Sequence, residues 1–281
     1  MGDFTMMENM SRENKPKRPS IFEEQISEEP DYHPWCDIYI EAIQDTPWTH
    51  RLYTFQSDVQ DFKVNLNAQQ QELIIRNLSL ISQLEVSVKR FWAKIGENFP
   101  HPNITNLGFV MAANEVVHGK AYKHLLKVLG IKGSFEDILQ LDFIKNRVNY
   151  LNKHIRKFHK DNKKQAIYSL ILFTLIIENI ALFAPFYTIS WFNKELQVVK
   201  DTNKQIQYTA REETIHSNVG IRIVNETRQD HPELFDDELE EKVLKEVRDS
   251  IEYELEIIGG SLNGFEGDGL ILVNASAAIS T

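Results

Sequence analysis

The stretch from Ala166 to Phe192 is the most apolar part of the chain, and it carries one charged residue, Glu178, near its centre. A run of about 20 apolar residues could span a bilayer, but Glu178 and Asn179 interrupt its middle and Pro185 interrupts its second half. We therefore expect the core helix of a large bundle rather than a membrane span. An unpaired ionised carboxylate in such a helix would cost several kcal/mol, so Glu178 must be neutral, paired or bound to a metal ion.

The overall composition narrows the class of protein. The 281 residues carry a formal net charge of −10, which argues against a nucleic-acid-binding surface. Cys36 is the only cysteine, so an internal disulfide and a cysteine-based zinc site are excluded, and a reducing, cytoplasmic setting is expected. The polar residues 1–32 lack the apolar core of a secretory signal and predict a mobile arm ahead of the folded domain.

Apolar spacing and capping residues predict helices throughout the domain and no strands. Asn67 and Gln70 have the pattern of a capping box, and Gly130 marks the end of a second long helix. The expected helices cover approximately residues 36–44, 67–95, 103–129, 135–159, 166–192, 196–224 and 233–258. This pattern predicts an all-helical domain over residues 33–258. Because Gly259 and Gly260 are poor helix formers, residues 259–281 are expected to form an irregular, Gly-rich tail.

A second isolated carboxylate lies on the helix that follows Asn67. The apolar residues of this helix recur at helical spacing, at Ile74, Leu78, Ile81, Val88 and Trp92. Glu85 falls on the same stripe. We therefore expect its side chain to point into the core.

Two copies of the motif Glu-x-x-His lie on two other expected helices. Glu115 and His118 stand in ANEVVHGKAY, and Glu213 and His216 stand in REETIHSNVG. Residues three apart share a helix face, so each pair can offer one oxygen and one nitrogen ligand to the same point. Either motif alone is a weak signal, because such pairs often occur by chance on solvated helices.

The four elements together make a specific pattern. With Glu85 and Glu178, the chain order becomes Glu, Glu-x-x-His, Glu, Glu-x-x-His on four long helices, which is the ligand set of carboxylate-bridged dimetal bundles. Four carboxylates balance the charge of two divalent ions, and two neutral imidazoles complete the ligands. The alternative, four structural carboxylates with two core histidines, needs a separate buried partner for each acid. Such ligands accept iron and manganese alike.

The remaining histidines have no carboxylate arranged on a shared apolar face and are expected to be solvated. They are His33, His50, His101, His124, His154, His159 and His231.

The segments that carry these residues resemble the small, radical-generating subunit of class I ribonucleotide reductase. They are ISQLEVSVKRFW, ANEVVHGKAY, LIIENIALFAPF and AREETIHSNVGIRIVN, and the resemblance extends from about Trp35 to Tyr253. It implies a ferritin-like, homodimeric protein that assembles a dimetal cofactor. That cofactor would supply the one-electron oxidant for reducing ribonucleoside diphosphates to deoxyribonucleotides on a separate large subunit, a step that serves DNA replication.

The resemblance also implies roles for individual residues. It places Glu85, Glu115 and His118 on one metal ion, and Glu178, Glu213 and His216 on the other, with Glu115 and Glu213 as bridges. Most members of the family have Asp at the first position. With Glu85 at this position, the chain resembles a subgroup that has a dimanganese centre and no tyrosyl radical. Manganese is therefore the favoured metal, and iron is the alternative.

Three further residues correspond to parts of an electron route. Tyr122 stands at the position of the family's radical tyrosine, and Trp48 resembles the tryptophan that begins the path to the large subunit. Glu212 takes the place of an Asp that holds the histidine ligand. Both aromatic residues would equally suit simple core packing. The family's docking tail carries a tyrosine, whereas this sequence has none after Tyr253.

Two other functions fit the same ligands. A ferritin-like oxidase or hydroxylase would use the centre on a substrate of its own. A metal-binding or assembly protein would use it structurally.

Overall fold

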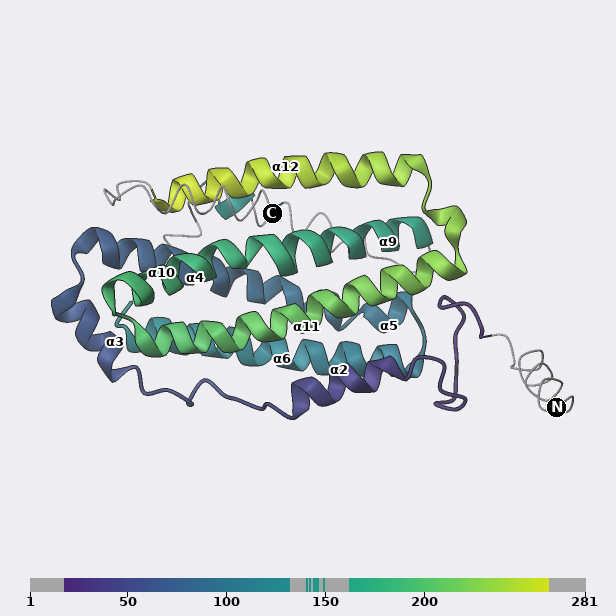
Figure 1. Ribbon diagram of the computed structural model, residues 1–281, viewed down its shortest axis with the longest axis horizontal. Coiled ribbons are helices and arrows are strands. Elements are labelled where there is room, and N and C mark those ends of the chain that lie inside the picture. Colours follow the sequence, from purple (N-terminus) through teal and green to yellow (C-terminus); the bar gives the residue numbers. More distant parts are fainter. Residues whose placement is uncertain are drawn as a thin grey trace, which may run out of the picture.

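The chain forms an elongated helical bundle whose long helices run roughly along its length (Figure 1). The computed structural model describes residues 18–131 and 162–262, together with positions 140, 142, 144–146 and 149. In order, the elements are α2 (Trp35–Gln44), α3 (Gln56–Gln60), η1 (Asp61–Asn65), α4 (Ala68–Trp92), α5 (Ile95–Asn98), α6 (Pro102–Val128), α9 (Lys163–Leu172), η2 (Phe173–Ala181), α10 (Phe183–Leu196), α11 (Lys200–Asp230), η3 (Pro232–Leu234) and α12 (Asp237–Leu262). The part of the chain described contains no strand, so the prediction of an all-helical fold is confirmed.

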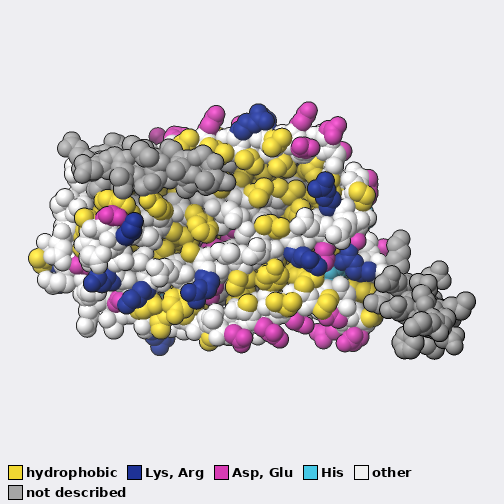
Figure 2. All heavy atoms as spheres, in the orientation of Figure 1, with side chains coloured by type: hydrophobic (Ala, Val, Ile, Leu, Met, Phe, Trp, Pro, Cys, Tyr) yellow, Lys and Arg dark blue, Asp and Glu magenta, His cyan; other side chains and the backbone are white. Residues whose placement is uncertain are grey.

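The core lies among α4, α6, α11 and the helical run formed by α9, η2 and α10. Helix α4 packs along α6, and α11 packs along η2. Helix α2 covers α6, while α12 covers α9 on the opposite edge of the bundle (Figure 1). Acidic side chains line both of these edges, over α12 and over α2 (Figure 2). The interior is therefore enclosed by helices, and acidic side chains gather along these two edges of the surface.

Helix α4 begins as the sequence predicts. The Asn67 side chain accepts a hydrogen bond from the Gln70 backbone N–H, and the Gln70 side chain accepts one from the Asn67 N–H. This capping box satisfies two backbone donors at the helix start. The predicted apolar stripe of α4 is buried, and Glu85 is buried with it at 0 % exposure.

Helix α6 also ends where expected. His101 caps its first turn by accepting a hydrogen bond from the Asn103 N–H, and Pro102 occupies the first position, where no N–H is needed. Gly130 follows the last turn with a φ of 78°, a left-handed conformation that glycine adopts without a steric cost.

The apolar stretch forms one continuous helical run, residues 163–196. It is long and apolar enough to cross a membrane, but 72 % of its most apolar window is buried inside the bundle. Packing against neighbouring helices thus accounts for its composition. The middle of the run, Phe173–Ala181, is a π-helix that contains Glu178. Pro185 lies in the first turn of α10, where its missing N–H costs little.

Helix α11 begins at Lys200, later than the predicted residue 196, because an acidic side chain from another element caps it. The backbone N–H of Thr202 donates to Asp58 Oδ2 at 2.7 Å, and its hydroxyl donates to the same oxygen at 2.6 Å. Asp61 accepts from the Val199 N–H at 2.8 Å. These capping partners lie about 140 residues away in the chain and leave no local sequence signal.

Two further element boundaries differ from the prediction. Helix α11 continues to Asp230, beyond the predicted residue 224. Helix α12 continues through Gly259 and Gly260 to Leu262, although glycine has a low helix propensity. The predicted helix at 135–159 and the tail after residue 262 lie outside the described residues.

The expected mobile arm is anchored from Arg18 onward. The Arg18 guanidinium forms ion pairs with Glu226 at 2.8 Å and Asp230 at 2.6 Å. Ile21 is 1 % exposed, and Phe22 stacks on Phe99 with ring centroids 5.5 Å apart. Arg18, Ile21 and Phe22 therefore attach the start of this segment to the bundle, whereas residues 26–30 are exposed. Residues 1–17 of the expected arm lie outside the described residues.

Two histidines expected to be solvated are buried beneath this anchored segment. His33 is 1 % exposed and its Nδ1 lies 2.8 Å from Glu226 Oε2. His101 is 3 % exposed and packs edge-on against His33, with ring centroids 4.4 Å apart. Burial lowers the pKa of His101 to about 4, so its ring is neutral at physiological pH.

Arg18→Ala should destabilise the protein by about 1 kcal/mol, because it leaves the nearly buried Glu226 with one fewer charged donor. Chemical denaturation of the metal-free protein measures this change. Arg222→Ala is the matched control: Arg222 also pairs with Glu226, at 3.1 Å, but its side chain is 52 % exposed. We expect a smaller effect there. Equal effects of the two substitutions would contradict an anchoring role for the segment at Arg18.

Candidate metal centre

Six buried side chains from four elements meet in the middle of the bundle. Each is 0 % exposed. They are Glu85 from α4, Glu115 and His118 from α6, Glu178 from η2, and Glu213 and His216 from α11. The structure therefore brings together every metal ligand that the sequence predicts.

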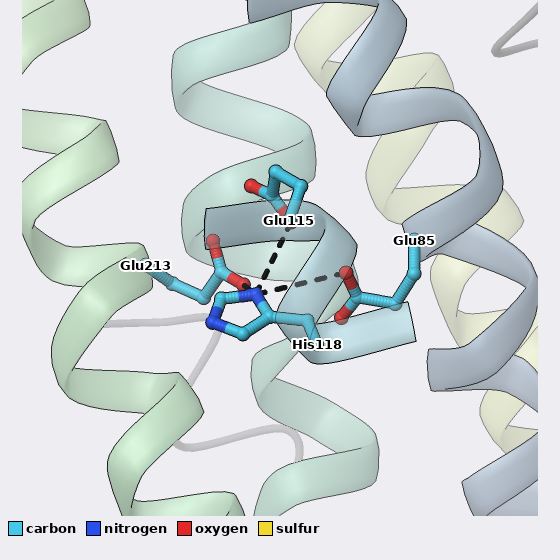
Figure 3. Close-up of side chains that lie close together, drawn as sticks. All are labelled: Glu85, Glu115, His118 and Glu213. Carbon is cyan, nitrogen blue, oxygen red and sulfur yellow. Dashed lines mark hydrogen bonds and ion pairs between the residues drawn. The ribbon is translucent and has the colours of Figure 1, made fainter. Parts of the chain in front are cut away.

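The first group surrounds His118 (Figure 3). One ligand atom from each of Glu85, Glu115, His118 and Glu213 lies within 4.8 Å of the others. His118 Nδ1 is 3.1 Å from Glu115 Oε2, 3.1 Å from Glu213 Oε1 and 3.7 Å from Glu85 Oε2. Three carboxylates and one ring nitrogen thus converge on one point.

The second group has the same composition and lies directly beside the first. Ligand atoms of Glu115, Glu178, Glu213 and His216 also lie within 4.8 Å of one another. His216 Nδ1 is 2.8 Å from Glu115 Oε1 and 3.0 Å from Glu213 Oε2. Each of the two shared carboxylates therefore turns one oxygen to each histidine, which is the geometry of a bridging ligand.

Several oxygens in the cluster lack the partners that buried oxygens require. Both carboxylate oxygens of Glu85, and Oε2 of Glu178, are buried without a hydrogen-bond donor among the described residues. Buried acceptors of this kind are rare in folded proteins unless a cation satisfies them. Four carboxylates and two imidazoles have the charge and ligand type for two divalent metal ions. The residues present fit such a pair.

Protons neutralise the cluster in the metal-free protein. Burial raises the pKa of Glu85 and of Glu178 well above the ordinary value for a carboxyl group. Burial also opposes the charge on Glu213, but His118 and His216 outweigh it and hold the pKa of Glu213 below its usual range. Burial thus favours the protonated form of Glu85 and Glu178, while the two histidines favour the ionised form of Glu213.

The two histidines carry the compensating positive charge. Burial favours their neutral form, but the carboxylates around them prevail. Glu85 and Glu213 raise the pKa of His118 well above its ordinary value, and Glu115 and Glu213 raise the pKa of His216 to about 9. Two dications would displace these protons and leave the net charge of the cluster unchanged.

Outside the ligands, Glu212 links His118 to Trp48. Glu212 Oε2 lies 2.7 Å from His118 Nε2 and accepts a hydrogen bond from Trp48 Nε1 at 2.8 Å. The Trp48 ring also stacks near the His118 ring, with centroids 5.9 Å apart. Trp48 and Glu212 of the suggested relay are therefore in direct contact with each other and with the His118 ring. A cleft of about 250 Å³ opens over Trp48 and Glu212.

Tyr122 is fully buried next to this cluster, but its hydroxyl points to a different neighbour. It donates a hydrogen bond to Thr209 Oγ1 at 3.0 Å. Burial and the nearby Glu85 raise the pKa of Tyr122 far above its ordinary value. The Thr209 hydroxyl accepts this hydrogen bond but is not a base. Among the described contacts, Tyr122 therefore has no group that could take up its hydroxyl proton.

Sequence reasoning missed one residue that contacts a ligand directly. Trp92 Nε1 donates a hydrogen bond to Glu178 Oε1 at 2.8 Å. The sequence shows Trp92 only as the end of the apolar stripe of α4. Its position seven residues after Glu85, on the same helix face, was the available signal.

This chain is similar to a known protein family and to several known proteins. The family described as "Ribonucleotide reductase, small chain" matches residues 28–275. The ribonucleoside-diphosphate reductase subunit beta of Chlamydia pneumoniae is 24 % identical over 209 residues, covering 68 % of this chain and 58 % of that protein. The corresponding subunit of Treponema pallidum is 21 % identical over 210 residues, with 72 % and 58 % covered. The chain thus spans little more than half the length of these relatives.

Solved structures show the same fold. A putative class I ribonucleotide reductase from Bacillus halodurans superposes with a TM-score of 0.77 at 18 % identity, covering 88 % of this chain and 92 % of that one. An R2-like ligand-binding oxidase with a Mn/Fe cofactor superposes with a TM-score of 0.69 at 18 % identity, with 91 % and 92 % covered. At these identities the likeness establishes architecture alone. The family match covers most of the chain, including all six converging side chains, and this chain belongs to the ribonucleotide reductase small chain family.

Proposed function

We propose that this chain is the small subunit of a ribonucleoside-diphosphate reductase and that it assembles a dimetal cofactor. The observation that carries the proposal is the pair of shared carboxylates, Glu115 and Glu213, each with one oxygen toward His118 and the other toward His216. When bound, the metal pair supplies the one-electron oxidant. Reduction of the ribonucleotide then takes place on a separate large subunit.

The chain's own residues would divide the work of holding the ions. Glu85 and His118 hold one ion, Glu178 and His216 hold the other, and Glu115 and Glu213 bridge the two. Complete burial excludes bulk water from all six side chains, which protects a strong oxidant from side reactions. Manganese is our preferred metal because Glu85 stands where most of the family has Asp, and iron is the alternative.

Trp48 and Glu212 would form the path along which the oxidising equivalent leaves the metal site. Glu212 accepts hydrogen bonds from both the ring nitrogen of Trp48 and the outer nitrogen of His118. The cleft over Trp48 and Glu212 brings this link close to the surface, where a partner could approach. We propose that the large subunit of the reductase is that partner.

Tyr122 is a weaker candidate for the store of the oxidant. An oxidised tyrosine loses its hydroxyl proton, and the hydrogen bond of Tyr122 leads to the Thr209 hydroxyl rather than to a carboxylate. We therefore propose that the metal ions hold the oxidising equivalent and that Tyr122 closes the wall of the site. A cytoplasmic homodimer that binds neither nucleic acid nor membranes completes the proposal.

A dimetal oxidase with its own substrate is the second candidate. The likeness to an R2-like ligand-binding oxidase over nine-tenths of both chains favours it. In that case the same ligands would serve without a large subunit.

Glu178→Ala should leave the protein with one strongly bound ion instead of two, because it removes a terminal ligand of the second ion. Metal analysis of the purified protein after manganese loading measures the stoichiometry, and electron paramagnetic resonance reports whether the remaining ion is still magnetically coupled. Glu226→Ala removes a buried carboxylate outside the cluster and should retain both ions. Two ions in Glu178→Ala would refute the ligand assignment.

Metal binding should release protons, and its affinity should rise with pH. At pH 7 the metal-free cluster holds up to four displaceable protons, on Glu85, Glu178, His118 and His216. Because the released protons are products of metal binding, a lower pH shifts the equilibrium toward the metal-free protein and weakens the affinity for metal. A pH indicator in weakly buffered solution counts the protons, and Glu178→Ala should release fewer. Two bound ions without proton release would contradict the charges assigned here.

Reconstitution with the large subunit tests the reaction itself. Ribonucleoside-diphosphate reduction should require this chain and its metal, and Tyr122→Phe should retain most of the activity. A more than 100-fold loss in Tyr122→Phe, with both ions still bound, would place the oxidant on the tyrosine. Unchanged reduction when this chain is omitted would sink the proposal. Oxygen consumption without a large subunit would instead support the oxidase.

A further inference from the structure

The π-helical segment η2 sets the direction in which Glu178 points. In an α-helix, residues four apart lie one above the other, whereas in a π-helix the hydrogen bonds join residues five apart. Within Phe173–Ala181 this spacing aligns Phe173 with Glu178, and Thr174 with Asn179. Two adjacent faces of the segment therefore carry two different pairs.

The contacts of the first pair lie toward α4. Phe173 stacks on Phe91 with ring centroids 3.8 Å apart. Glu178 Oε1 accepts the hydrogen bond from Trp92, the residue after Phe91. This face presents the carboxylate of Glu178 to the metal cluster.

The contacts of the second pair lie toward α11. Asn179 Nδ2 donates to the carbonyl oxygen of Thr174 at 2.6 Å and to Ser217 Oγ at 2.7 Å. The first bond spans the five-residue spacing of the π-helix. The second joins the segment to the residue that follows His216. Ser217 is 4 % exposed, whereas Asn179 is exposed, so the junction is buried on the α11 side only.

Gly220 makes the close approach possible. A Cβ atom at this position would lie 2.0 Å from Thr174 Oγ1, far inside van der Waals contact. Gly220 lies one helical turn after His216, on the same side of α11. Thr174, Asn179, Ser217 and Gly220 thus form an interlock between η2 and α11, next to one ligand from each element.

We propose that Asn179 is a positioning residue for the second metal ion, acting through this interlock. If the segment relaxed to an α-helix, the four-residue spacing would align Glu178 with Thr174 and move its carboxylate away from Trp92. Asn179 opposes that change because its amide donates to both the Thr174 carbonyl and Ser217 Oγ, and a shift in register would move the Thr174 carbonyl relative to Asn179. The inference rests on the proposed dimetal centre.

The test uses metal affinity rather than enzyme activity. Asn179→Ala and Ser217→Ala should each weaken binding of the second ion by about 10- to 100-fold, the usual effect of removing a group that orients a ligand. Titration of metal-free protein with Mn²⁺, followed through the electron paramagnetic resonance signal of the free ion, separates the first binding event from the second. Ser217→Thr keeps the hydroxyl group, so this variant should bind the second ion with wild-type affinity.

Asn193→Ala is the matched control. Asn193 lies on the same helical run, donates to the Val198 carbonyl at 3.0 Å and contacts Asn203 of α11, but it is 15 residues from Glu178. We expect it to bind both ions as the wild type does. A change equal to that of Asn179→Ala would mean that any link between the two helices matters, and would overturn the proposal.

A suppressor pair tests the interlock from the other side. Gly220→Ala should lower the affinity for the second ion, and Thr174→Ala should recover much of the loss in the double variant by removing the clashing hydroxyl. Wild-type affinity in both Asn179→Ala and Gly220→Ala would overturn the inference while leaving the dimetal centre in place. A wild-type protein that binds fewer than two ions would overturn the proposed function itself.

Discussion

Placing four carboxyl groups at one fully buried point is the constraint on which the rest of the structure depends. Their mutual repulsion and their loss of hydration would cost far more than the stability of a typical domain if all four were ionised and unpaired. In the metal-free protein, burial favours the protonated form of Glu85 and Glu178, and the surrounding carboxylates favour the charged form of His118 and His216, which lowers that cost. Two dications would serve the same purpose. The surrounding helices are long, and their buried apolar side chains seal this point from water.

The two ion positions are supported by different means. On the first side, the outer nitrogen of His118 is held by Glu212, which is held in turn by Trp48. On the second side, Nε2 of His216 is buried without a hydrogen-bond partner among the described residues. The second position depends instead on Glu178, which Trp92 and the π-helical segment orient. A series of hydrogen bonds thus supports the first ion position, and the backbone geometry of the π-helical segment supports the second.

The six converging side chains could be picked out from the sequence because each leaves a local signal. Glu85 and Glu178 are acids on apolar faces, and the two Glu-x-x-His motifs fall on helices whose spacing is regular. The π-helix leaves no such signal, since its register depends on contacts with α11 that are distant in the chain. The same reason accounts for the cap of α11, where Asp58 lies 144 residues before Thr202.

Errors at the N-terminal side have a related physical cause. Charged residues around Arg18 suggested a solvated arm, and His33 and His101 were expected at the surface. In the structure, Arg18 pairs with two acids from the end of α11, and the buried histidines lie beneath that contact. Composition shows how many charges a segment carries, but not whether residues distant in the chain form ion pairs with it in the folded protein. Local polarity therefore overestimates disorder wherever a distant element supplies the partner.

Glu212 shows how a departure from a family pattern can preserve a connection. A Glu in place of Asp adds one methylene group, which would displace the carboxylate if the backbone and its partners stayed fixed. Here a single oxygen, Oε2, meets both Trp48 and His118, at 2.8 and 2.7 Å. Because one atom joins both partners, the link does not require the two carboxylate oxygens to point in opposite directions. The longer side chain therefore keeps the contact between tryptophan and histidine, which is the contact that the proposed electron route requires.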